Sequence, residues 1–359
     1  MDTASLNLDW NPRLPRRLDR GIGIVGAGAI VAGAHLPAYR KAGFNVVGIT
    51  NRTRSRAAPL ATEFDIPHVY DDLDAMLADD AIEIIDIAVA PRTQYDLAVS
   101  AAHAGRHLLC QKPMHEELAE ARSLVEATAA TGVKLAVNQQ LRWDGRMRAV
   151  RQLLDEGWIG RPTLGTINVH INNPWNLAFM QGSKYQELMY HSIHYFDTIR
   201  YLFGEPARLF CSTGSEPPRG QGTETRSTTV LEYDGGPTVL VHCSTDNPTA
   251  TPAATFRFEG SEGVVSGDYD LFTGGGGSPE ALSIYSKKLG ANPATTVTIP
   301  ERRVPDAFIG PMASLMCAIE DDTDPDPSGR DNLRTLRLVH AAYLSAAEHR
   351  VVEPVEFDD

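Results

Sequence analysis

The chain has 359 residues, with a hydrophobic fraction of 42% and a charged fraction of 22%. These are ordinary globular values, and the length favours two domains, so the composition argues against disordered, fibrous and membrane classes. A formal net charge of −13 offers no basic surface to nucleic acid or anionic lipid, so neither partner is expected. The four cysteines lack metal-type spacing, and the first twenty residues contain no secretory apolar core, which favours a cytoplasmic protein.

The N-terminal part of the chain predicts an α/β fold. Residues 1–20, rich in proline and arginine, are expected to form an exposed arm. From residue 21, short apolar runs alternate with longer helix-like stretches, which is typical of a doubly wound parallel sheet. We expect strands at 21–26, 46–50, 83–89, 107–110 and 134–138. Helices are expected near 29–42, 53–64, 71–78, 93–104 and 116–131. Residues 21–137 are therefore predicted to form a Rossmann domain.

The pattern changes after residue 138, where β-type runs follow one another with few helices between them. Such runs predict a mostly antiparallel sheet, here an open one in a C-terminal α/β domain over residues 138–359. The expected strands lie at 163–171, 207–213, 227–234, 237–245, 254–259 and 263–267. The expected helices lie near 143–156, 188–203 and 331–348.

A glycine turn between the first strand and the first helix predicts dinucleotide binding. Gly26 permits the tight turn and Gly28 lets the backbone approach a pyrophosphate. Ala29 and Ile30 begin the helix, whose N-terminal N–H groups attract phosphate. The third position of the fingerprint holds Val31 in place of glycine or alanine, so the match is imperfect.

The end of the second strand bears on the choice between NAD and NADP. An acidic residue there normally binds the ribose hydroxyls of NAD, and this chain has Asn51. Without a carboxylate to repel a 2′-phosphate, and with Arg52 and Arg56 as donors, NADP is slightly favoured over NAD. The alternative is that both arginines are simply solvated.

Several motifs, in order, resemble those of the Gfo/Idh/MocA oxidoreductase family. They are Gln111-Lys112-Pro113, resembling the Glu-Lys-Pro motif; the segment from Ile87 to Gln94; Asn138-Gln139-Gln140 with Arg142; Gly157 to Gly160; and His194 with Asp197. The resemblance covers most of the chain. It implies hydride transfer between a nicotinamide and a secondary alcohol or ketone of a sugar, inositol or related polyol. It also implies a homodimer or homotetramer built through the C-terminal sheet.

The resemblance also implies roles for individual residues. Oxidation of a secondary alcohol needs a proton acceptor and a donor to the developing oxyanion, and Lys112 and His194 can serve. Asp197 can orient or charge-compensate the histidine. Tyr190 stands where many family members have an aspartate, and Gln111 replaces the motif glutamate. The implied cofactor contacts in this region are Pro91, Thr93, Gln94, Gln111, Lys112 and Asn138.

Substrate contacts are expected from Arg142, Trp143, Trp175 and His191, because aromatic faces and polar groups bind sugar rings. No metal site is expected from His191, His194 and Asp197, because residues six apart on a helix diverge by about 120°. Two other functions remain open. One is a glycosidase that uses bound NAD transiently, and the other is a non-catalytic dinucleotide sensor.

Overall fold

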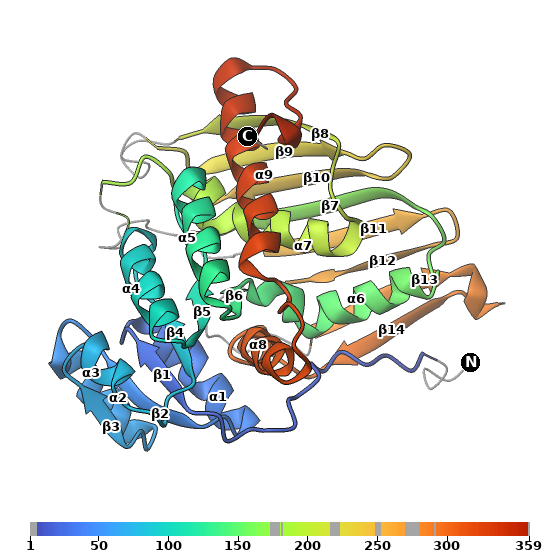
Figure 1. The fold of residues 1–359 in the computed structure, drawn as a ribbon. Helices are drawn as coiled ribbons and strands as arrows, with labels where there is room; N and C mark the ends of the chain where they lie inside the picture. Colours follow the sequence, from blue (N-terminus) through green and yellow to red (C-terminus); the bar gives the residue numbers. More distant parts are fainter. Residues whose placement is uncertain are drawn as a thin grey trace. The chain divides into compact units, whose positions relative to one another are not determined.

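The computed structural model describes residues 6–172, 180, 182–215, 223–247, 253–269, 280–290 and 292–357. The chain divides into two compact units. The parallel-sheet unit consists of Pro12–Trp143 and Val304–Arg334. The large-sheet unit consists of Met1–Asn11, Asp144–Arg303 and Thr335–Asp359. Each unit contains one β-sheet (Figure 1).

The parallel-sheet unit has a six-stranded sheet in the order β3-β2-β1-β4-β5-β6. All its strand pairs are parallel. The strands are β1 (Ile22–Val25), β2 (Val46–Thr50), β3 (His68–Tyr70), β4 (Ile84–Ile87), β5 (His107–Gln111) and β6 (Leu135–Asn138). Because β1 pairs with both β2 and β4, the strand order reverses between β1 and β4. Such a reversal places a ligand site at the carboxyl ends of these strands.

Apolar runs explain the strands of this unit. β1 and β4 are buried at every position, as expected for a sheet covered on both faces. The helices that connect the strands are α1 (Leu36–Ala42), α2 (Arg54–Glu63), α3 (Leu73–Leu77), α4 (Pro91–His103) and α5 (Leu118–Thr131). One turn of π-helix, η2 (Val31–His35), precedes α1. The core includes side chains of β1 and β2 and of helix α8 (Ile309–Asp321).

The large-sheet unit has an eight-stranded sheet in the order β14-β13-β12-β11-β7-β10-β9-β8. Only the pairing of β10 with β7 is parallel among the described strands. The strands are β7 (Pro162–His170), β8 (Arg208–Gly214), β9 (Arg226–Glu232), β10 (Thr238–Ser244), β11 (Ala253–Gly260), β12 (Gly263–Asp268), β13 (Glu280–Ser286) and β14 (Ala294–Ile299).

Alternating burial gives this sheet one covered and one open face. Buried and more exposed residues alternate along β9 and β11, which is the pattern of a sheet packed on one side. Helices α6 (Gly145–Asp155), α7 (Ile193–Phe203) and the later part of α9 (Gly329–Glu348) lie on the covered face (Figure 1). Leu164, Phe210 and Tyr285 are exposed large hydrophobic residues at alternate, outward-facing strand positions.

The predicted fold class is confirmed, with an α/β parallel sheet followed by a mostly antiparallel one. The predicted strands agree with the observed ones to within a few residues. Among the described strands and α-helices, the three-residue strand β3, the strands β13 and β14, and the helix α8 were not predicted. The predicted helix at 188–203 is a π-helical turn, η5 (Leu188–Ser192), followed by α7.

The compact units differ from the predicted domain boundaries in two places. Residues 304–334, expected in the C-terminal domain, belong to the parallel-sheet unit, where α8 contributes to the core. The expected exposed arm, residues 1–20, is divided between the units. Trp10 donates to Glu301 within the large-sheet unit, and Arg13 pairs with Asp321 within the parallel-sheet unit. Its described part is therefore partly packed, because its polar groups find partners.

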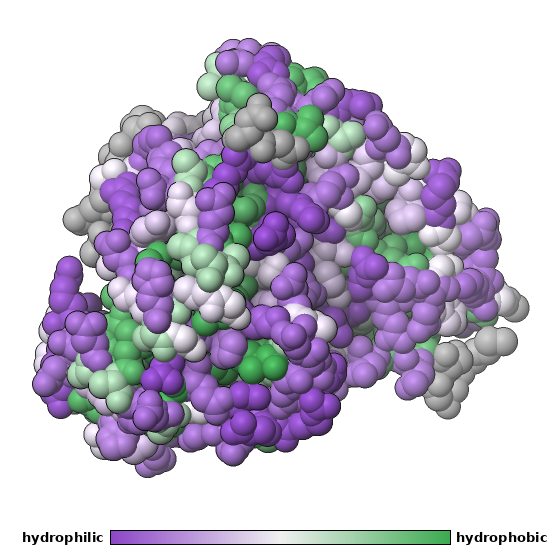
Figure 2. Space-filling view, viewed as in Figure 1, coloured by the Kyte–Doolittle hydropathy of each residue, from purple (hydrophilic) through white to green (hydrophobic). Residues whose placement is uncertain are grey.

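Hydrophilic residues cover most of the face seen in Figure 2, and hydrophobic residues form separate patches between them. Within the described ranges, no helix combines the length and apolar character needed to cross a membrane.

Candidate functional site

The glycine turn after β1 has the geometry that a bound phosphate needs. Gly26 has φ +123°, and a Cβ there would lie 2.5 Å from the carbonyl oxygen of Ala88, which follows β4. A Cβ at Gly28 would meet nothing within 4 Å, so the space over this backbone is open. Val31, in the third fingerprint position, is fully buried. The turn therefore leaves room for a pyrophosphate although the sequence match is imperfect.

Asn51 connects the end of β2 to this turn. Its Oδ1 accepts a hydrogen bond from the Ala27 N–H at 3.2 Å, and its Nδ2 donates to the Thr53 carbonyl at 2.9 Å. Arg52 and Arg56 are exposed, and neither has an ion pair within the described part of the chain. Both guanidinium groups can therefore reach an anion without breaking a salt bridge.

Gln94 holds the turn that carries Lys112. Its Nε2 donates to the carbonyl oxygens of Gln111 at 2.9 Å and Pro113 at 3.0 Å, and its Oε1 accepts from the Gln111 N–H at 2.9 Å. The side chain is fully buried. Both ends of the amide therefore bind backbone groups on either side of the half-buried Lys112, and the contact of Gln94 with a cofactor stays a prediction.

A buried polar network lies at the carboxyl ends of β4, β5 and β6, and sequence analysis missed its centre. His35 Nδ1 lies 2.7 Å from Asp86 Oδ2, which also accepts from the Tyr39 hydroxyl at 2.8 Å. His35 Nε2 lies 3.1 Å from the amide nitrogens of Gln111 and Asn138. Since amide nitrogens only donate, Nε2 accepts and Nδ1 carries the hydrogen. Burial and Asp86 raise the pKa of Tyr39 well above its usual range.

Two signals in the sequence point to this network. Asp86 is a carboxylate within an otherwise apolar strand, and a buried charge requires partners. His35 lies on the helical segment directly after the glycine turn. Gln111 also accepts the Lys112 N–H at 2.8 Å, so the network reaches the predicted catalytic lysine.

The remaining predicted cofactor residues lie at the starts of two helices. Ala29 is exposed and Ile30 half-buried, directly after the glycine turn. Pro91 is the first residue of α4 and is buried, whereas Thr93 in the first turn is exposed. Asn138 is buried at the end of β6, and its Oδ1 has no hydrogen-bond partner among the described residues.

The large-sheet unit carries the other predicted catalytic residues on η5 and α7. Tyr190 and His194 are buried, with exposed fractions of 6% and 3%. Asp197 Oδ1 accepts from the Thr335 hydroxyl at 2.8 Å and lies 3.9 Å from an Arg200 nitrogen. This carboxylate therefore has structural partners on α7 and α9, a role that the sequence did not indicate.

Arg142 and Trp143 both have partners within the parallel-sheet unit. Arg142 is almost fully buried and pairs with Asp326 and Asp331, each at 2.7 Å, and its contact with substrate stays a prediction. Trp143 packs on Gly310 of α8, where a Cβ would lie 2.2 Å from the indole. Trp175 lies outside the described residues.

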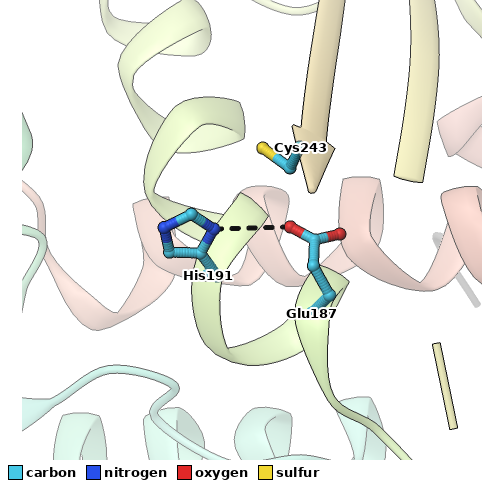
Figure 3. Close-up of side chains that lie close together, drawn as sticks. All are labelled: Glu187, His191 and Cys243. Carbon is cyan, nitrogen blue, oxygen red and sulfur yellow. Dashed lines mark ion pairs between the residues drawn. The ribbon is translucent and has the colours of Figure 1, made fainter. Parts of the chain in front are cut away.

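His191 faces an acidic side chain within its own unit. Its Nδ1 lies 3.5 Å from Glu187 Oε1, and its side chain is 14% exposed. The thiol of Cys243 is close to both (Figure 3). Sequence analysis assigned His191 to substrate and did not consider the other two residues.

Comparison with known proteins identifies both units. The family described as "Oxidoreductase family, NAD-binding Rossmann fold" matches residues 20–139. The "GFO/IDH/MocA C-terminal domain" matches residues 147–266.

The chain is similar to named dehydrogenases over most of its length. A D-apiose dehydrogenase of Paraburkholderia graminis is 30% identical over 338 residues, 89% of this chain and 86% of the relative. A D-xylose 1-dehydrogenase (NADP(+)) of Haloferax volcanii is 23% identical, covering 92% of this chain and 98% of the relative. The fold matches an Agrobacterium radiobacter oxidoreductase solved with NAD+, L-tartaric acid and magnesium, with TM-score 0.80, 22% identity and coverage of 94% and 99%. The chain belongs to the Gfo/Idh/MocA family of NAD(P)-binding oxidoreductases.

Proposed function

We propose that the protein is an NAD(P)-dependent dehydrogenase or reductase that acts on a secondary alcohol or ketone of a sugar, inositol or related polyol. The observation that carries the proposal is the open turn at Gly28. This turn follows β1 and lies beside the loop after β4, at the carboxyl end of the parallel sheet. That is the position at which doubly wound sheets bind nucleotides. The names of the D-apiose and D-xylose dehydrogenases support a sugar substrate.

The cofactor residues are those around the glycine turn and the end of β2. Gly26 and Gly28 would receive the pyrophosphate on open backbone, and Asn51 would lie near the adenosine ribose. Arg52 and Arg56 favour NADP over NAD, because they supply positive charge and no carboxylate opposes a 2′-phosphate. Bound NAD(P) supplies the site that accepts or donates the hydride.

Proton transfer is assigned to Lys112 and His194. The Lys112 ammonium donates a hydrogen bond to the reacting oxygen and stabilises negative charge on it. His194 takes up the hydroxyl proton, for which imidazole is suited near neutral pH. Tyr190, which the family resemblance places at the position of an aspartate, would supply a hydroxyl to the substrate. Gln94 and Gln111 keep the lysine turn in place.

Calorimetric titration with NADP and NAD, followed by absorbance of the reduced nicotinamide with a panel of sugars and inositols, tests this function. We expect tighter binding of NADP and substrate-dependent reduction. Cofactor that co-purifies and is never reduced in net terms would favour the glycosidase alternative. Binding without turnover on any compound would favour a dinucleotide sensor, and no binding would refute the proposal.

The open face of the large sheet supports a homodimer or homotetramer. Leu164, Phe210 and Tyr285 are each more than 40% exposed on strands of this sheet. A Phe210→Glu variant should shift the mass measured by light scattering to that of a single chain, because a charge cannot be buried in an apolar contact.

We also propose a cytoplasmic location, because the four cysteines form no disulfide, which fits a reducing compartment.

A further inference from the structure

Three side chains of different ligand type meet in the large-sheet unit. Glu187 directly precedes the π-helical turn η5, His191 lies within that turn, and Cys243 lies on the covered face of β10. Their ligand atoms lie within 4.8 Å of one another. Figure 3 shows the imidazole and the carboxylate facing each other, with the sulfur above the space between them.

We propose that Glu187, His191 and Cys243 bind one zinc-class divalent cation. One thiolate, one imidazole and one carboxylate are the ligand types of zinc sites, and three protein ligands leave a fourth position for water or a ligand oxygen. Ligand atoms around a tetrahedral zinc ion are roughly 3.5 Å apart. The 3.5 Å between His191 Nδ1 and Glu187 Oε1 already has this value. The sulfur needs a shift of only about 1 Å.

One tautomer of His191 suits a cation between the first two ligands. Its Nε2 lies 3.4 Å from the Tyr195 hydroxyl oxygen, which can accept the ring N–H. In that tautomer Nδ1 directs a lone pair toward the carboxylate of Glu187, and a cation between these two acceptors binds both. Metal-binding histidines are commonly fixed in this way by a partner on the other nitrogen.

Glu187 provides a second, independent observation. The residue is fully buried, and its Oε2 has no hydrogen-bond partner within the described part of the chain. A buried oxygen without a partner is costly, and a coordinated cation removes that cost. Its Oε1 accepts from the Ser192 hydroxyl at 2.5 Å, which holds the carboxylate toward the cluster.

The environment of Cys243 explains what the cation must displace. Burial, together with the nearby charge of Glu187, raises the pKa of the Cys243 thiol well above its usual range. The thiol is therefore protonated without a metal, and formation of the sulfur–metal bond releases that proton to solvent. The partial exposure of His191 gives the ion a route from solvent.

The test is cobalt(II) and zinc binding to the full chain after chelator treatment. We expect one ion per chain, with a thiolate-to-cobalt charge-transfer band in the near ultraviolet. All four cysteines are buried, so the band reports on an internal thiolate rather than on a surface thiol. Zinc added to the cobalt form should abolish the band. Absence of a thiolate band in the wild-type protein overturns the proposal.

Cys211 on β8 provides a matched control, because it is also buried on the covered face of the sheet. Cys211→Ser should keep the band, and Cys243→Ser should lose it. His191→Gln, at a partly exposed position, should weaken zinc binding at least about 10-fold in a chelator competition, and it serves if Cys243→Ser does not fold. Equal zinc affinity in His191→Gln and wild type would also overturn the proposal. NADP titration of the same samples separates this result from the proposed function.

Discussion

Replacing Gln94 tests whether its side chain holds the turn that carries Lys112 in place or contacts the cofactor. Gln94→Leu removes two hydrogen bonds to carbonyl oxygens and one from the Gln111 N–H. A net value of about 0.5–1.5 kcal/mol for each of the three bonds gives a loss of about 1.5–4.5 kcal/mol in the free energy of unfolding. That loss is tolerable for a protein stable by about 5–15 kcal/mol, so the variant should fold. Displacement of Lys112 by about 1 Å should lower kcat about 10²-fold.

Urea unfolding and hydrogen exchange of the peptide that contains Gln111 measure these effects. Gln94→Leu should lower the urea midpoint and speed exchange of the Gln111 amide. Gln94→Glu is a matched control, since one carboxylate oxygen still accepts from that amide while the other repels the two carbonyls. Gln94→Glu should therefore keep the Gln111 amide protected from exchange, and it should still lower the urea midpoint. An unchanged midpoint and exchange rate, combined with weaker dinucleotide binding, would refute this role of Gln94.

Four further changes have expected outcomes. Lys112→Ala should lower kcat about 10²-fold in steady-state assays while calorimetry shows unchanged dinucleotide affinity, and normal turnover would exclude the lysine from the chemistry. Asn51→Asp should weaken NADP binding about 10-fold relative to NAD, because the carboxylate repels the 2′-phosphate; an unchanged ratio would contradict the NADP assignment. Asp144→Asn should cost about 3–5 kcal/mol in urea unfolding, since the buried Arg146 loses its charged partner; a loss below about 1 kcal/mol would count against this. Burial raises the pKa of Glu224 from 4.5, so the stability it contributes is present below pH 4.5 and lost as pH rises through the folded pKa. The stability difference between wild type and Glu224→Gln should therefore fall with rising pH, and a flat difference would contradict the sign.

Five of the six strands of the parallel sheet could be predicted because they are short, mostly apolar runs that alternate with longer helix-like stretches, and each run is a local signal. β3 could not, because three residues provide too little periodicity. α8 is mostly apolar and buried, and it begins with Ile309, Gly310 and Pro311, so its sequence gives little of the polar face that would indicate a helix. Its position in the parallel-sheet unit depends on contacts with β5 and β6, which are far away in sequence.

The glycine turn at Gly26 and Gly28 could be located from the sequence because its backbone geometry requires glycine, and its contact with a cofactor stays a prediction. Site residues were less predictable where a side chain has several possible partners. The ion pairs of Arg142 could not be predicted, because its carboxylate partners lie 184 and 189 residues away in sequence. An amide such as Gln94 gives no sign in the sequence of whether it binds a ligand or its own backbone. Long-range pairing of this kind is fixed only by the fold.

The buried network gives a physical reason for glutamine in place of the motif glutamate. His35 offers one lone pair at Nε2, and the amides of Gln111 and Asn138 both donate to it. Its Nδ1–H is used by Asp86, the charged member of the set. A glutamate at position 111 would place a carboxylate oxygen, which accepts, opposite the accepting Nε2 of His35. The imidazole would then need a second proton. The neutral amide of Gln111 can donate to a singly protonated His35, so the hydrogen bonds from Gln111 through His35 to Asp86 have one consistent set of donors and acceptors next to Lys112.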